Sequence, residues 1–231
     1  MNKYLRGLQT HIGLKFVVAL TGAALVIFVI AHMLGNLQIY LGPDAVNAYA
    51  EQLKSMPGLL WIARIGLLAA FLIHIGGITK LTLDNRDARE TAYAVKHSRR
   101  ATLSSRTMAL SGIILLSFVI YHLMHFTLGV THPEHFNLRD PLGRHDVYSM
   151  TVLGFRETAV VLPYLVAMLL LGMHLAHGVA SVFQSMGWNR PKFFPLVDAF
   201  GQIVALVIVI GNISIPLSCW LGWIEPMQRA L

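Results

Sequence analysis

The chain has 231 residues, of which 55% are hydrophobic and only 13% are charged, and its mean hydropathy is +0.61. A soluble domain carries about 25% charged residues, so this composition excludes an ordinary water-soluble fold. The formal net charge is +7, but the Lys and Arg residues lie between apolar runs, which is typical of membrane topology and not of a nucleic-acid-binding face. Cys219 is the only cysteine. This excludes an internal disulfide, a cysteine-ligated metal cluster and covalent haem attachment.

The apolar runs predict an all-α integral membrane protein with five transmembrane helices in a single membrane domain, residues 1–231. Each run reaches the ~20 residues that cross a ~30 Å hydrocarbon layer, and lipid favours helices because their backbone groups are paired internally. The runs cover about residues 16–41, 59–82, 107–130, 158–183 and 200–221. Residues 43–56 read as a short amphipathic helix at the membrane interface, and residues 131–147 as a polar external loop, either ordered or flexible.

Basic residues set the expected orientation. Twelve of the 18 Lys and Arg fall before the first run, from Lys80 at the end of the second run to Arg106 before the third, or between the fourth and fifth runs. The positive-inside rule therefore places the N-terminus in the cytoplasm and the C-terminus outside, in a multi-pass protein of the inner (cytoplasmic) membrane. The most basic of these segments, residues 80–106, is the expected docking surface for a hydrophilic partner.

Six of the eleven histidines lie inside the apolar runs, where ionisable side chains are expensive and usually mark function. A lone membrane histidine is often only a neutral imidazole that hydrogen-bonds a neighbouring helix. Here every one of the first four runs carries at least one histidine, and the fifth carries none. The six are His32, His74, His122, His125, His174 and His177.

The depths of these histidines predict two levels. His32 lies late in the outward-running first helix, and His122 and His125 lie late in the outward-running third helix. The second and fourth helices run inward and carry His74 and His174–His177 near their ends. Helical rise puts the two levels roughly 15 Å apart. Facing imidazoles at one depth can ligate one haem iron, so we expect two haem b groups in a four-helix bundle, with a fifth helix beside it.

Small residues beside the histidines support this interpretation, because a porphyrin needs space next to its ligand. Gly35, Gly77 and Gly178 follow His32, His74 and His174 at i+3 or i+4, on the same helix faces. Gly129 suits His122 and His125 equally, so geometry alone leaves the choice in the third helix open.

The motifs around these histidines resemble the single-chain, five-helix, two-haem cytochrome b anchor of succinate dehydrogenases and fumarate reductases. They are AHMLGN at His32, FLIHIGG at His74, SFVIYHLMHF at His122 and GMHLAHGVASVFQSMGW at His174. The resemblance implies that His32 and His122 ligate the iron of an outer (distal) haem, and His74 and His174 that of an inner (proximal) haem. By the same resemblance, His125 and His177 support the ligands or fill space.

The resemblance also implies the partners. They are a flavoprotein that oxidises succinate and an iron–sulfur subunit, with menaquinone as the electron acceptor. The chain would anchor this respiratory complex II and carry electrons without itself oxidising succinate. Some relatives have a glutamate two residues before the fourth-helix ligand that serves transmembrane proton movement. This chain has Gly172 there, which puts that route in doubt.

Quinone reduction needs protons, so a polar group must stand near a haem and the membrane surface. The candidates at the cytoplasmic side are His11, Lys15, Ser105 and Arg106, of which the basic members could instead hold haem propionates. At the outer side the candidate is Glu51. Each also has a plain structural interpretation, such as membrane anchoring for Lys15 and Arg106 or helix capping for Ser105.

Two other classes compete with this interpretation. One is the cytochrome b anchor of a nitrate reductase, hydrogenase or formate dehydrogenase, and the five-helix nitrate reductase type carries ligands in its last helix, where this chain has no histidine. The other is a proton-coupled transporter with a histidine relay. A transporter predicts carboxylates along a path through the membrane, whereas Glu157 and Asp198 lie only at the ends of runs.

Overall fold

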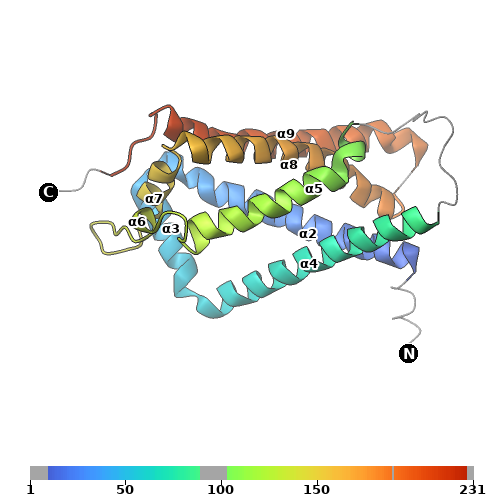
Figure 1. The fold of residues 1–231 in the computed structure, drawn as a ribbon, viewed down its shortest axis with the longest axis horizontal. Helices are drawn as coiled ribbons and strands as arrows, with labels where there is room; N and C mark the ends of the chain where they lie inside the picture. Colours follow the sequence, from blue (N-terminus) through green and yellow to red (C-terminus); the bar gives the residue numbers. More distant parts are fainter. Residues whose placement is uncertain (1–9, 89–102, 189, 228–231) are drawn as a thin grey trace.

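The computed structural model describes residues 10–88, 103–188 and 190–227. These ranges are almost entirely helical, and their one β-type pairing is an isolated bridge between Arg139 and His145. Five of their helices are long and apolar enough to cross a membrane and run along the long axis of the molecule (Figure 1). They are α2 (His11–Leu37), α4 (Pro57–Asp87), α5 (Leu103–His122), α8 (Thr158–Ser185) and α9 (Phe194–Trp220). The predicted all-α membrane fold with five spans is confirmed.

Several helices extend beyond the apolar runs that predict them. α2 begins at His11 because the Thr10 side chain caps it, accepting a hydrogen bond from the Gly13 N–H at 3.1 Å. α4 continues through polar residues to Asp87. α5 changes after His122 into a π-helical turn, η2 (Leu123–Thr127). Hydropathy marks the part of a helix that suits the hydrocarbon layer, whereas caps and local hydrogen bonds mark its ends.

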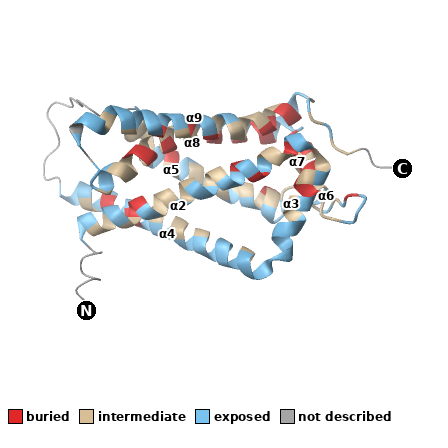
Figure 2. Ribbon diagram, turned by 180° about the vertical axis from the view of Figure 1, so that it is seen from behind, coloured by how far each residue is buried: buried red, intermediate tan, exposed pale blue. Residues whose placement is uncertain are grey.

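The most extensive helix packing joins α8 to α9. A Cβ at Gly201 of α9 would lie 2.7 Å from the Ala176 carbonyl oxygen of α8, so glycine permits this close approach. α2 completes the core, where its Met33 meets Leu175 and Ile208. α4 packs mainly on α2, and α5 mainly on α8. α4 is therefore exposed along most of its length (Figure 2).

The two ends of the bundle differ in character. At one end, which we call the basic end, lie Lys15, Lys80, Arg106 and Lys192. At the other end, which we call the capped end, three short helices gather: α3 (Pro43–Ser55), α6 (Pro133–Phe136) and α7 (Val147–Gly154) (Figure 1). The short helix expected over residues 43–56 is thus present as α3. The expected docking segment 80–106 lies mostly outside the described residues, which exclude 89–102.

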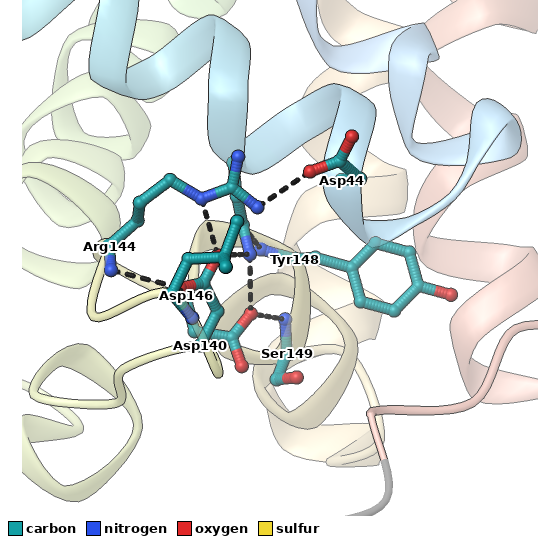
Figure 3. A network of polar contacts seen from close by, with 8 residues as sticks. Asp44, Asp140, Arg144, Asp146, Tyr148 and Ser149 are labelled. Atoms are coloured by element: carbon teal, nitrogen blue, oxygen red, sulfur yellow. Dashed lines mark hydrogen bonds and ion pairs between the residues drawn. The ribbon is translucent and has the colours of Figure 1, made fainter.

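The capped end is held by a polar network around Asn47 of α3, which is only 1% exposed. Its Nδ2 donates to Asp140 Oδ2 at 3.3 Å and to Asp146 Oδ1 at 3.2 Å, and its Oδ1 accepts from the Tyr148 N–H at 3.0 Å. Asp146 also caps α7 by accepting from the Ser149 N–H (Figure 3). Two segments about a hundred residues apart in sequence are joined at one buried amide.

Arg144 closes this network from the solvent side. Its guanidinium donates to Asp140 at 2.6 Å and to Asp44 of α3 at 2.7 Å (Figure 3). Burial alone would raise the pKa of Asp140, but hydrogen bonds and the charge from Arg144 lower it below its ordinary value. The segment 131–147 is therefore an ordered part of the fold, built around α6 and this ion pair.

Candidate functional site

His32 of α2 and His122 at the end of α5 meet within the membrane part of the bundle. Their ring centroids lie 5.8 Å apart, with an interplanar angle of 88°. Imidazole nitrogens bind metals at ~2 Å, so two rings flanking one metal ion have centroids about 6 Å apart. The structure brings this pair together at the separation that a shared metal requires.

The His122 ring is oriented by Tyr164 of α8, a residue that the sequence interpretation missed. The His122 Nδ1 atom lies 3.3 Å from the Tyr164 hydroxyl. In the tautomer with the proton on Nδ1, this bond leaves Nε2 as a free lone pair for a metal. An outer hydrogen bond of this kind fixes the tautomer and raises the basicity of a metal ligand.

His32 has no such partner. Its ring stacks on Phe28, with centroids 5.5 Å apart, but no described residue hydrogen-bonds it. In the isolated chain the His32 side chain is exposed. It lies on a membrane-spanning helix, where a polar group without a hydrogen-bond partner is unfavourable in hydrocarbon. A partner from outside the polypeptide is the simplest way to satisfy it.

His125 is placed differently from His122. It is 2% exposed and its ring stacks on Phe126, with centroids 3.9 Å apart. Its Nδ1 shares the Tyr164 hydroxyl at 3.3 Å, and its Nε2 would lie 2.9 Å from a Cβ on Gly154. The backbone of α7 thus closes off the nitrogen that a metal would use. Local packing favours His122, a choice that spacing along the third helix left open.

A second level lies nearer the basic end, where His74 of α4 faces α2. Its Nδ1 lies 3.2 Å from the Val18 carbonyl oxygen and 3.4 Å from Thr21 Oγ1. His174 of α8 is held in the same manner by α5, with its Nδ1 3.2 Å from Ser111 Oγ. Both rings are anchored through Nδ1, which leaves both Nε2 atoms for a metal.

His177 lies one turn beyond His174, but its Nε2 contacts Ser181 Oγ at 3.2 Å. The hydrogen bond therefore occupies the nitrogen that a ligand would offer. This contact favours His174 as the ligand on α8.

The distance between the two histidine levels follows from residue separations on three helices. Thr21 and His32 are 11 residues apart on α2, as are Ser111 and His122 on α5, which corresponds to about 17 Å of rise. On α8, Tyr164 and His174 give about 15 Å. The agreement between helices means that each level is one layer across the bundle, at the spacing expected from sequence.

Not all of the glycines near the histidines leave the space for a porphyrin that the sequence suggests. A Cβ at Gly35 would lie 2.9 Å from the Tyr49 ring of α3, and one at Gly77 would lie 2.5 Å from Val18 of α2. The expectation that these two glycines leave space for a porphyrin is wrong, because both accommodate helix packing. Gly178 does face open space. Gly129 has φ +66 and contacts Phe136, so it serves the turn after η2.

Two glycines that the sequence interpretation did not select lie beside the second level. A Cβ at Gly22 of α2 would lie 3.0 Å from His74 Cε1, and one at Gly112 of α5 would lie 3.7 Å from His174 Cε1. Each of these glycines lies on a neighbouring helix that faces the histidine, and not on the histidine's own helix. Spacing within one helix cannot reveal such neighbours, whereas the polar residues Thr21 and Ser111 inside apolar runs were a usable signal.

Gly172, which replaces the glutamate of some relatives, is packed against α9. A Cβ there would lie 2.5 Å from Val209 Cγ2. A longer side chain at this position would collide with the neighbouring helix, so the local packing suits glycine and not a carboxylate.

The polar candidates at the basic end are not assembled into one site. His11 is exposed and lies 3.6 Å from Asp84 of α4. Lys15 and Arg106 are exposed on the first turns of α2 and α5, and Ser105 is half-buried within the first turn of α5. These two helices do not pack extensively on each other among the described residues. At the capped end, Glu51 is exposed on α3 in a shallow depression that Lys54 and Arg139 also line.

In comparisons with protein-family models, curated proteins and solved structures, no significant match to this chain is found.

Proposed function

We propose that this chain is a dihaem cytochrome b that anchors a succinate:quinone oxidoreductase to the membrane and carries electrons between an iron–sulfur subunit and menaquinone. The observation that carries the proposal is the placement of histidines at two levels, about 15–17 Å apart by helical rise, with the His32 and His122 rings in contact at one of them. His32 and His122 would hold the distal haem at the capped end. His74 and His174 would hold the proximal haem nearer the basic end.

The residues present fit this cofactor. Each bound haem b supplies an iron that accepts and releases one electron. The protein supplies neutral imidazoles whose Nδ1 atoms are held by Tyr164, Ser111 and the Val18 carbonyl. Fixed rings keep ligand orientation constant between oxidation states, which lowers the reorganisation that electron transfer requires. Gly22 and Gly112 leave space beside the proximal pair.

The identity of the complex rests on the resemblance of the four histidine motifs to succinate dehydrogenase anchors. In the proposed orientation, the N-terminus and the basic end face the cytoplasm, where a flavoprotein and an iron–sulfur subunit would dock. The capped end faces outside. The two subunits would oxidise succinate, and this chain would conduct the electrons into the membrane.

Protons for the quinone carbonyls must come from residues near a membrane surface. We place the candidates His11, Ser105 and Arg106 at the basic end and Glu51 at the capped end. Glu51 shares an exposed depression with Lys54, Arg139 and His145, and Glu51→Gln tests its role in proton delivery directly.

The deciding experiment isolates the chain with its native partners and measures electron transfer from succinate to a menaquinone analogue. We expect a flavoprotein and an iron–sulfur protein to co-purify and the preparation to be active. A haem-containing preparation with a different partner would assign the chain to a nitrate reductase, hydrogenase or formate dehydrogenase anchor. A colourless preparation would remove the cytochrome assignment and favour the transporter.

A further inference from the structure

A second group of metal-binding side chains lies at the capped end, outside both histidine levels. His132 precedes α6, His135 lies within α6, and Glu157 precedes α8. One possible ligand atom from each residue lies within 4.8 Å of the other two. The electron-transfer proposal gives these residues no role.

The local backbone fixes the two imidazoles on one face of a turn. The His132 carbonyl oxygen accepts hydrogen bonds from the N–H groups of His135 and Phe136, each at 3.1 Å. Pro133 at the first position of α6 restricts the backbone of His132. The rings of His132 and His135 are nearly parallel, with an interplanar angle of 11° and centroids 5.4 Å apart.

The group also contains an unused nitrogen. His135 Nδ1 is buried, and no described residue hydrogen-bonds it. His132 Nδ1 lies 3.7 Å from Glu157 Oε1, so imidazole and carboxylate already face each other. A buried nitrogen without a partner is unfavourable, and a bound cation nearby is one way to satisfy it.

We propose that His132, His135 and Glu157 bind a divalent transition-metal ion, with Zn²⁺ as the ion that fits best. Two imidazoles, one carboxylate and a water form a common tetrahedral zinc site. Metal–ligand bonds of ~2 Å place tetrahedral ligands about 3.4 Å apart, so the present atoms need to move by no more than about 1.4 Å.

The Glu157 side chain has room to move toward the two histidines. The Glu157 side chain is 46% exposed, and its backbone carbonyl is fixed by the N–H groups of Val160 and Val161. The carboxylate can therefore swing inward while its helix stays in place. Mg²⁺ and Ca²⁺ prefer all-oxygen sites, which makes them poor competitors here.

The test is isothermal titration of the purified full-length chain with ZnCl₂, using an affinity tag without histidine. We expect one saturable site in the parent protein. His132→Gln, His135→Gln and Glu157→Gln should each weaken binding by about tenfold or more, since even indirect partners of a metal ligand are worth 10- to 100-fold. Far-UV circular dichroism checks that each variant is folded.

Two matched controls make the result specific. His11→Gln removes an exposed histidine at the opposite end and should bind Zn²⁺ like the parent. Glu134→Gln removes an acid that lies 3.3 Å from His132 but outside the triad, so it should weaken Zn²⁺ binding less than Glu157→Gln does. Absence of a saturable site, or loss of the site in Glu134→Gln but not in Glu157→Gln, would overturn the proposed ligand set. Zinc binding does not depend on haem, so its failure leaves the cytochrome proposal untouched.

Discussion

The hydroxyl of Tyr164 lies 3.3 Å from His122 Nδ1, and it lies at the same distance from Nδ1 of His125. One hydroxyl on α8 thus orients two imidazoles that are three residues apart on the neighbouring helix. The π-turn η2 carries His125, and turns of this kind are frequent at functional sites. The two histidines share a hydrogen-bond partner, and of the two only His122 is proposed to bind a haem.

Tyr164→Phe tests the orienting role of the hydroxyl. The variant keeps the ring and its packing but removes the hydrogen bond to His122, so the imidazole becomes a weaker base. We expect both haems to bind, with the affinity for the distal haem reduced by about 10- to 100-fold and its reduction potential raised. A redox titration followed in the visible spectrum measures this. Leu165→Ala is the control on the same helix, and an unchanged distal haem in Tyr164→Phe would contradict the role.

His122→Ala and His125→Ala separate ligand from packing. Loss of His122 should remove the distal haem and leave one haem per chain. His125→Ala should retain two haems but destabilise the fold by about 1–3 kcal/mol, because it removes a buried, hydrogen-bonded ring. Haem content and thermal unfolding distinguish the two. The reverse result would exchange the residues' roles.

Gly22→Val tests the space beside the proximal pair. Even a Cβ at this position would lie 3.0 Å from His74 Cε1, so a branched side chain must displace the imidazole. We expect loss of the proximal haem only. Gly66→Val on α4, where a Cβ meets nothing within 4 Å, should keep both haems. If Gly22→Val also keeps both haems, the proximal haem does not bind beside Gly22.

Asn47→Ala tests the polar network of the capped end. The substitution removes the amide that pairs with Asp140, Asp146 and the Tyr148 N–H, and it leaves buried groups unsatisfied. We expect a loss of about 1–3 kcal/mol in stability, seen as faster hydrogen exchange in α3 and α7. Gln52→Ala on the exposed face of α3 is the control. Equal exchange in the two variants would show that the network contributes little.

The network should also weaken in acid. The pKa of Asp140 lies below its ordinary value of 3.8 in the folded protein. Its stabilisation is therefore complete above the unfolded pKa and is lost as the pH falls through the lower folded pKa. Proteolysis of the segment 131–147 by an acid-stable protease should accelerate only at the acidic end of that range. Acceleration near neutral pH would mean that another group controls the segment.

The sequence predicts the fold well because long apolar runs leave few alternatives to membrane helices. It predicts the two histidine levels because helical rise converts residue number into depth. It does not predict that Gly35 and Gly77 serve packing, since their neighbours Tyr49 and Val18 come from other segments. Tyr164 was missed for the same reason. Contacts between helices depend on rotation and tilt, which hydropathy does not encode.

The sequence also leaves open whether the segment 131–147 is ordered. Its polar composition is typical of a surface loop, but Asp140 and Asp146 pair with Asn47, about a hundred residues earlier in the chain. Such pairing depends on tertiary contacts and leaves no periodic pattern in the sequence.

In the dihaem proposal, two pairs of histidines each hold one haem. The haem-to-protein ratio of the purified chain, taken from its reduced-minus-oxidised visible spectrum, tests this, with His32→Ala and His74→Ala measured beside it. We expect two b-type haems in the parent and one in each variant. A parent without haem, or variants that both retain the full content, would rule out the dihaem assignment.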